Sequence, residues 1–365
     1  MSDVPGFGKA LVIITGASRG FGRALALEIA ARVDAAGSVL VLAARSEDKL
    51  HELQTHVTRV ASELNVRCVT ADLSRKEDVE RVITVIRETQ CADIDHLLLF
   101  NNAASLGDVS RYGRDFTDVD EVDSYLSFNV SSALCLTTGV LRAVPRRVGL
   151  TRVIINISSL CAIKPFASWI LYCTGKAARE MMFRVLAKEE PDLRVLSYAP
   201  GTTTPREQAL MLFSSLLLFT SSLLLFTSSL LLFTSSLLLF TSSLLLFTSS
   251  LLLFTSSLLL FTSSLLLFIS SLLLFTSSLL LFTSSLLLFT SSLLGIKASA
   301  KSRPLDTDMQ LQARSSSADD SVRSACSAVH AQGQLLTCEA SVSKLMKVLL
   351  EGNFTSGAHL DFYDV

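Results

Sequence analysis

A tyrosine and a lysine lie four residues apart in the segment YCTGK, as Tyr172 and Lys176. With this spacing on a helix, the two side chains share one face and lie one turn apart. A cation beside a tyrosine lowers its pKa from about 10 toward neutral pH, so Lys176 can make Tyr172 a better proton donor. Ser159 lies thirteen residues before Tyr172, and its hydroxyl can hydrogen-bond a carbonyl oxygen. The three residues predict proton donation to a carbonyl group.

A glycine-rich segment, TGASRGFG, lies between a predicted strand and a predicted helix. Its three glycines have the spacing G-x-x-x-G-x-G. Glycines at such a turn let the backbone approach a pyrophosphate, whose charge then lies at the helix N-terminus. The strand before and the helix after are the context that this interpretation requires. The predicted cofactor-binding segment is Gly16, Ala17, Ser18, Arg19, Gly20, Phe21 and Gly22.

The end of the second predicted strand indicates which dinucleotide binds. NAD enzymes usually carry Asp or Glu there, and the carboxylate binds the ribose 2′-hydroxyl. This chain instead has Arg45, followed by Ser46, and Arg19 in the glycine loop is a second cation. Two guanidinium groups suit a 2′-phosphate, so NADP(H) is the predicted cofactor. Further contacts to it are predicted from Asp72, Leu73 and Asn101, at the ends of the third and fourth strands.

The elements that must position these residues are strands alternating with helices. Near-continuous apolar runs indicate strands that are buried on both faces. Such strands, alternating with segments of helical spacing, predict an α/β fold: a Rossmann-like, doubly wound parallel sheet of about seven strands. The runs begin at Leu11, Ser38, Val66, His96, Arg152 and Leu193, and a seventh lies in GAHLDFYD.

A low-complexity block interrupts this pattern. The motif SSLLLFT repeats from residue 214 to residue 294, varied once by Ile269, without charge, glycine or proline. A membrane anchor is disfavoured, because the repeat has no polar break for loops and no flanking aromatic belt. We expect an insert at 202–303 that divides one NADP-binding domain into residues 1–201 and residues 304–365.

Composition narrows the classes of protein. The formal net charge of −1 and the pI of about 6.5 give no reason to expect nucleic acid as a partner. The seven cysteines are scattered and never spaced C-x-x-C, which favours free thiols in a reducing compartment over disulfides or a zinc site. The N-terminal segment has no signal-peptide pattern. A cytoplasmic protein without a bound metal is the expectation.

The motifs together resemble the short-chain dehydrogenase/reductase family. Within that family, ITGASRGFGR, NISSLCA, PLDTDMQ and SGAHLDFYD are similar to the sepiapterin reductases. The resemblance covers residues 1–201 and 304–365. The residues that carry the family pattern are Gly16, Gly20, Gly22, Asn101, Asn102, Ala103, Asn129, Ser159, Tyr172 and Lys176.

The resemblance implies an NADPH-dependent enzyme that reduces side-chain carbonyls of a pterin, in the last step of tetrahydrobiopterin synthesis, and that forms a homodimer. Tyr172 would donate the proton, Ser159 would orient the carbonyl, Lys176 would bind the cofactor ribose and Asn129 would support the relay. The cofactor's nicotinamide would lie against Leu305, Asp306, Thr307, Asp308, Met309 and Gln310.

The substrate site follows from the same resemblance. Asp361 would anchor the pterin, because a carboxylate accepts the adjacent 2-amino and ring N–H groups in bidentate fashion. Leu160 and Gly201 would lie beside Ser159 and Tyr172 in the substrate pocket.

Two departures from the family pattern keep alternatives open. Ala104 stands where the family usually has glycine, and the insert separates Gly201 from Pro304 within what would otherwise read APGPLDTDM. A reductase of other carbonyls, or a protein that binds NADP without catalysis because the insert misplaces the nicotinamide segment, are the alternatives. Comparing the turnover of sepiapterin with that of simple diketones distinguishes a pterin reductase from a reductase of other carbonyls. Tight NADPH binding without turnover of any carbonyl would favour the protein that binds NADP without catalysis.

Overall fold

The computed structural model describes residues 6–89, 93–201, 235 and 304–365. All but residue 235 belong to one unit, which comprises residues 1–203 and 301–365. The predicted insert at 202–303, including nearly all of its repeat, and Cys91 lie outside the described residues.

Seven strands of the described chain form one parallel sheet, which confirms the predicted fold. Their order is β3-β2-β1-β4-β5-β6-β7, with the chain reversing direction across the sheet after β3. The strands are β1 (Ala10–Thr15), β2 (Val39–Ala44), β3 (Asn65–Thr70), β4 (His96–Asn101), β5 (Thr151–Ile157), β6 (Leu193–Ala199) and β7 (Ala358–Asp361).

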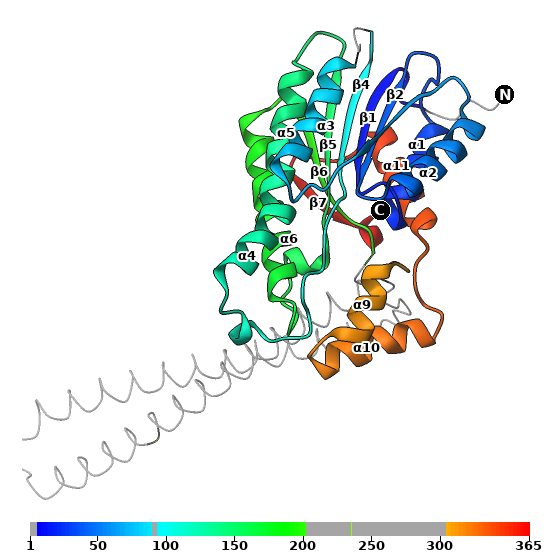
Figure 1. Ribbon diagram of the computed structural model, residues 1–365. Coiled ribbons are helices and arrows are strands. Elements are labelled where there is room, and N and C mark those ends of the chain that lie inside the picture. Colours follow the sequence, from blue (N-terminus) through cyan, green and yellow to red (C-terminus); the bar gives the residue numbers. More distant parts are fainter. Residues whose placement is uncertain (1–5, 90–92, 202–234, 236–303) are drawn as a thin grey trace, which may run out of the picture. The chain divides into compact units, whose positions relative to one another are not determined.

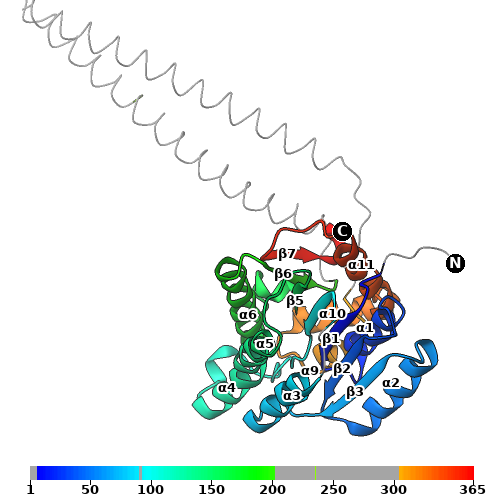
Figure 2. The same ribbon diagram turned by 90° about the horizontal axis from the view of Figure 1, so that it is seen from above.

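Helices cover both faces of the sheet (Figure 2). On one face lie α1 (Gly20–Ala30), α2 (Glu47–Val60) and α11 (Cys338–Glu351). On the other lie α3 (Lys76–Glu88), α5 (Ser132–Ala143) and α6 (Ile170–Glu189). The sequence of α3 shows why: Val79, Val82, Ile83 and Ile86 are buried at i, i+3, i+4 and i+7, one apolar stripe against the sheet.

The expectation of strands buried on both faces is correct at the centre and wrong at the edges. Every residue of β1 and β2 is buried, whereas β3 alternates between exposed and half-buried positions until Val69. Strand β7, at the opposite edge, is only half-buried before Asp361. Both edge strands have one neighbouring strand instead of two, which leaves their outer sides open to solvent.

Within the described ranges, three further α-helices lie away from the two layers. They are α4 (Val119–Leu126), α9 (Asp308–Ser316) and α10 (Asp320–Ala331). Helices α9 and α10 lie at the lower end of the sheet in Figure 1, where α4 also lies. Capping side chains begin the last two, because Thr307 accepts from the Gln310 N–H and Asp319 accepts from the Ser321 and Val322 N–H groups. None of the helices in the described ranges combines the length and apolar content needed to cross a bilayer.

Candidate active site

A cavity of about 770 Å³ lies at the carboxyl ends of the strands. Its wall contains residues that follow β1, β2, β3, β4, β5 and β6, and the segment that leads into α9 closes one side. Ligands of open parallel sheets bind at this edge. Of the predicted site residues, those in the wall are Gly16, Ser18, Arg19, Gly20, Phe21, Gly22, Arg45, Ser46, Leu73, Tyr172, Lys176, Leu305, Asp306, Thr307, Asp308 and Met309.

The glycine loop has the backbone that its glycines predicted. Gly16 has a φ of 66° and Gly20 a φ of 52°, both in the left-handed region that L side chains rarely adopt. A Cβ on Gly22 would lie 2.3 Å from the Gly16 carbonyl oxygen, so no side chain fits there. Asn102 fixes the loop from β4, because its Nδ2 donates to the carbonyl oxygens of Thr15 (2.8 Å) and Gly16 (3.2 Å). The loop is a cradle of backbone amides with room for a diphosphate.

Three cations line the cavity around the ends of β1 and β2. Arg45, Arg19 and Lys49 all belong to its wall. The sequence prediction missed Lys49, although it lies four residues after Arg45 at the start of α2, where one helical turn brings a second cation to the same edge. With Ser46 also in the wall, this end of the cavity suits a phosphate group beyond the diphosphate.

Asp72 has a local role in the structure. Its carboxylate accepts hydrogen bonds from the Ser74 N–H (3.1 Å) and hydroxyl (2.9 Å). Partial burial alone would raise the pKa of Asp72, but the bonds from Ser74 and the charges of Arg45 and Arg75 outweigh it and lower that pKa. The carboxylate is therefore ionised at neutral pH and attracts Arg45, which lies in the cavity wall.

Arg19, in the glycine loop, contacts a residue that follows the predicted insert in the sequence. Its guanidinium forms an ion pair with Asp308, at the start of α9. Both side chains are more than half exposed, so solvent screens the pair and its contribution to stability is small. The pair joins the glycine loop to the segment predicted to hold the nicotinamide, and it occupies one of the two guanidinium groups assigned to the 2′-phosphate.

Tyr172 is buried in α6, and its pKa differs from the prediction. Burial raises the pKa of Tyr172, Cys161 adds to the rise, and the hydrogen bond with Ser159 offsets only part of it. The expected lowering of this pKa is wrong, because burial outweighs every contribution that would lower it. The Lys176 Nζ lies over the tyrosine ring, 5.6 Å from its centroid, and donates to the Ile157 carbonyl oxygen (2.6 Å). Tyr172 therefore keeps its proton at neutral pH, which suits a proton donor.

Ser159 lies next to Tyr172 in the structure, as their spacing in the sequence predicted. It is buried at the end of β5, hydrogen-bonds Tyr172, and accepts from the Cys161 N–H (3.2 Å). Leu160 follows it, buried in the short helix Leu160–Ala162. A hydroxyl beside the phenol can bind the same carbonyl oxygen that receives the proton.

Asn129 lies in a π-helical turn, Ser127–Ser131, between α4 and α5. Its side chain is buried, accepts from the Ser105 N–H (2.8 Å) and donates to the Tyr125 carbonyl oxygen (2.9 Å). An added Cβ on Gly175 would lie 3.7 Å from the Asn129 Cβ, so the turn packs closely against α6 beside Lys176. Single π-helical turns are frequent at functional sites, where they redirect a helix.

Several predicted residues lie outside the wall of the cavity. Asn101 is buried and turned away, because its Nδ2 donates to Thr137 Oγ1 (3.0 Å), and Asn102 and Ala103 line the wall in its place. Asp361 is buried at the end of β7, where it accepts from the Tyr363 N–H (3.2 Å). The wall also excludes Ala17, Asp72, Asn129, Ser159, Leu160, Gly201 and Gln310. The sequence pattern also marked Asn102, Ala103 and Ala104, which lie in the wall, and the wall residues that the prediction missed are Ala43, Ala44, Lys49, Ala71, Phe128, Ile157, Ser158, Pro200, Leu311 and Arg314.

A small apolar cluster surrounds Tyr172 on the side away from the sheet. It combines the loop after β4, the segment before α6, and α9 with α10. Trp169 stacks edge-on against Tyr172, with ring centroids 5.9 Å apart, and its Nε1 donates to Ser317 Oγ (2.9 Å). The cluster brings segments from both sides of the insert around the proton donor.

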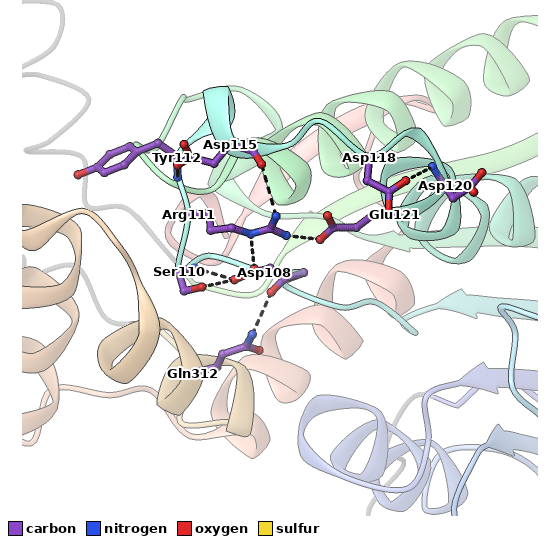
Figure 3. A network of polar contacts seen from close by, with 10 residues as sticks. Asp108, Ser110, Arg111, Tyr112, Asp115, Asp118, Asp120, Glu121 and Gln312 are labelled. Carbon is purple, nitrogen blue, oxygen red and sulfur yellow. Dashed lines mark hydrogen bonds and ion pairs between the residues drawn. The ribbon is translucent and has the colours of Figure 1, made fainter.

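Polar contacts hold the loop after β4 in this position (Figure 3). Arg111 binds Asp108 (2.7 Å) and Glu121 at once, and it lies 4.3 Å from the centroid of the Phe116 ring. The Gln312 Nε2 donates from α9 to the Gly107 carbonyl oxygen (2.9 Å). The loop and α9 thereby form one continuous wall beside Tyr172.

A glycine-rich cradle on a parallel sheet, with Ser159, Tyr172 and Lys176 at its far end, is the arrangement of a dinucleotide-dependent oxidoreductase. The family of short chain dehydrogenases matches residues 10–210, more than half of the chain. This chain belongs to the short-chain dehydrogenase family.

Particular relatives are similar over much of their length. Over 194 residues the chain is 51% identical to the sepiapterin reductase of Xenopus laevis, covering 53% of this chain and 73% of the frog protein. It is 34% identical over 359 residues to the sepiapterin reductase of Rattus norvegicus, covering 98% of each. The solved structure of the KRED1-Pglu enzyme has a TM-score of 0.59 and 20% identity, covering 96% of this chain and all of that one, and so shares its fold.

Proposed function

We propose that this chain is an NADPH-dependent reductase of pterin side-chain carbonyls, with sepiapterin as a substrate. The observation that carries the proposal is the buried Tyr172, hydrogen-bonded to Ser159, in the wall of a cavity of about 770 Å³ that the glycine loop also lines, in a chain 51% identical over 194 residues to a sepiapterin reductase. The glycine cradle fits the cofactor, because Gly16, Gly20 and Gly22 line the cavity at the N-terminus of α1, where a diphosphate can approach the backbone.

The chain's own residues would divide the work as follows. NADPH supplies the hydride when bound. Ser159 orients the substrate carbonyl oxygen and Tyr172 donates a proton to it, because both hydroxyls lie within reach of one another. Lys176, held by the Ile157 carbonyl oxygen, places its ammonium group over the Tyr172 ring and beside the predicted ribose position.

A preference for NADPH over NADH follows from the cations at the second strand. Arg45→Asp is expected to lower the ratio of kcat/KM for NADPH to that for NADH by about tenfold to a hundredfold, since a hydrogen bond to a charged group contributes about 1.5–3 kcal/mol. Steady-state kinetics with both coenzymes measure the ratio. Arg87→Asp is the control, because Arg87 is exposed on α3 and outside the cavity wall. An unchanged ratio in Arg45→Asp would show that Arg45 does not read the 2′-phosphate.

Asp361 is the residue that separates a pterin reductase from a reductase of other carbonyls. Asp361→Asn is expected to raise the KM for sepiapterin by about tenfold or more, because only the pterin presents paired donors to a carboxylate. Turnover of a small diketone should change little. Asparagine can still accept from the Tyr363 N–H, so the turn at the end of β7 is preserved.

Two comparisons complete this test of the proposed function. Asp364→Asn serves as a matched control, because Asp364 is an exposed carboxylate three residues further on. Equal losses on sepiapterin and on the diketone would place Asp361 outside the pterin site. A wild-type enzyme that reduces diketones and leaves sepiapterin unchanged would overturn the pterin assignment and keep the reductase.

A homodimer and a cytoplasmic location remain predictions. The exposed apolar side chains of Leu134 on α5 and of Met181 and Val185 on α6 support association of two copies through these helices. The mass of the protein in solution checks the dimer. The six cysteines of the described residues are free, in keeping with a reducing compartment.

A further inference from the structure

A buried carboxylate, Glu180, lies one helical turn after Lys176 on α6. Its Oε2 accepts from the Ser158 hydroxyl (2.8 Å) and from His359 Nδ1 (2.9 Å). Ser158 belongs to the cavity wall at the end of β5, and His359 lies on β7, after the insert. Glu180 therefore connects the wall of the active site to a strand contributed by the far C-terminal segment.

Two buried cations near Glu180 have only uncharged hydrogen-bond partners among the described residues. Lys176 and Arg179 are both almost fully buried on the same helix. Lys176 donates to the Ile157 carbonyl oxygen, and Arg179 donates to Asn156 Oδ1 and to the carbonyl oxygens of Asn101 and Ala103, all of which are uncharged. Buried cations with neutral hydrogen-bond partners need a compensating charge nearby, because burial favours their neutral forms.

Other titratable groups also lie near these cations. The groups that face the cluster are Tyr172 from α6, Tyr125 from α4, Cys161 from the short helix after β5, His359 and Asp361 from β7, and Asp364 after it. Burial raises the pKa of Tyr125, and the hydrogen bond that Cys161 donates to Cys173, together with burial, raises the pKa of Cys161, so both stay protonated. Among the groups of the described residues that interact with Lys176, Glu180 is the carboxylate, and its pKa is lowered.

We propose that Glu180 is a positioning residue of the reductase: its carboxylate, one helical turn from Lys176, supplies the negative charge beside the buried Lys176 and Arg179 and holds Ser158 and β7 against the active site. The proposal rests on the proposed reduction, in which Lys176 lies beside Tyr172. The pKa directions agree with the geometry. Burial and Arg179 lower the pKa of Lys176, while Glu180 opposes that change. Burial opposes the charge of His359, yet the bond to Glu180 raises its pKa above the ordinary value.

Glu180→Gln tests the role of the charge, because glutamine keeps the shape and the hydrogen-bonding capacity of the side chain. The alkaline limb of the pH profile of kcat/KM should move to lower pH by about one unit, since Lys176 then loses its proton more easily. His359→Asn breaks the same link to β7 and should leave that limb in place, because an imidazole is already neutral at alkaline pH. A shift of the limb in H359N equal to that in E180Q would show a structural role and overturn the proposal.

The matched control is Asp192→Asn. Asp192 also pairs with a buried cation, Arg152 (2.8 Å), at the amino ends of β5 and β6, and lies outside the cavity wall. Its variant should keep the wild-type pH profile. No shift of the limb in E180Q would contradict the proposal, whichever carbonyl substrate is used. A small diketone serves as substrate alongside sepiapterin, so failure of the pterin assignment remains distinguishable from failure of this inference.

A second measurement does not need activity. The ring protons of His359, assigned by their loss from the NMR spectrum of H359N, should titrate above the ordinary midpoint of about 6.5 in the wild-type chain and lower in E180Q. Should E180Q not fold, the wild-type titration still decides whether Glu180 is charged against His359. A wild-type midpoint below the ordinary value would overturn the proposal.

Discussion

Replacing Tyr172 by phenylalanine is expected to lower carbonyl reduction by about 10²–10⁴-fold, the usual contribution of a positioned general acid. The substitution removes one hydroxyl and keeps the ring that packs against Trp169. Because the raised pKa of Tyr172 keeps the wild-type phenol protonated at neutral pH, the loss should appear across the neutral range. Single-turnover kinetics at saturating NADPH measure the chemical step directly.

Binding of the cofactor separates this loss from damage to the fold. NADPH affinity of Tyr172→Phe should stay near that of the wild-type chain, since the phosphate-binding residues around Gly16 and Arg45 are untouched. Ser159→Ala should lower the rate by a smaller factor, because the phenol that donates the proton remains. Near-normal turnover by the phenylalanine variant would remove Tyr172 from the mechanism.

Short-range patterns made much of the site predictable from the sequence. The conformation of the glycine loop is determined locally, because Gly16 and Gly20 adopt positive φ angles and Gly22 packs closely against the Gly16 carbonyl oxygen. The pairing of Tyr172 with Lys176 depends on a single helical turn. In each case the spacing alone determines which groups meet, so these predictions hold in the structure.

Features that depend on long-range packing could not be predicted from the sequence. The sign of the pKa shift at Tyr172 depends on how deeply α6 is buried and on where the Lys176 ammonium lies. Glu180 meets His359 across 179 residues of sequence, and no local pattern marks that contact. The sequence pattern also predicted Asn101 as a site residue. In the structure Asn101 donates to Thr137 and its neighbour Asn102 faces the glycine loop, because successive side chains of an extended segment point to opposite sides.

Helices α9 and α10 show a different limit. Their sequences are polar overall and α10 has no fully buried residue, so no apolar stripe identified them in advance. Their position depends on Trp169 and on the loop after β4, as Ser317 and Gln312 show.

The ends of the predicted insert are both held by one C-terminal segment. The Pro200 carbonyl oxygen accepts from Ser341 Oγ (2.7 Å). Leu336 binds the other end, since its N–H donates to the Pro304 carbonyl oxygen (2.8 Å) and its carbonyl accepts from the Asp306 N–H (3.0 Å). Pro200 and Leu305 also line the same cavity. Residues 336–341 can therefore place both ends without any contribution from residues 202–303.

Other observations favour an insert that the enzyme does not need. The alignment to the frog protein covers 53% of this chain and 73% of that protein, so the relative is considerably shorter. Near-perfect repetition of seven residues is typical of recent duplication of DNA, or of a retained intron, and not of selection for a packed structure. Loop entropy alone would tolerate it, because lengthening a loop from a few residues to about a hundred costs only about 3 kcal/mol. The apolar repeat itself is the hazard, as uncharged segments rich in Leu and Phe without proline favour aggregation.

A variant that lacks residues 202–303, and so joins Gly201 to Pro304 to restore APGPLDTDM, is expected to be soluble and to reduce sepiapterin with NADPH. The full chain should be poorly soluble or at least several-fold less active, because the uncharged repeat is rich in Leu and Phe and interrupts the segment that leads to Leu305 and Asp308 in the cavity wall. Parallel expression of both forms, with soluble yield and kcat/KM measured side by side, checks this. A deletion of residues 214–294 alone shows whether the repeat or the whole insert is responsible. Peptides of the repeat recovered from a fully active enzyme purified from its natural source would contradict the prediction that the insert impairs the enzyme.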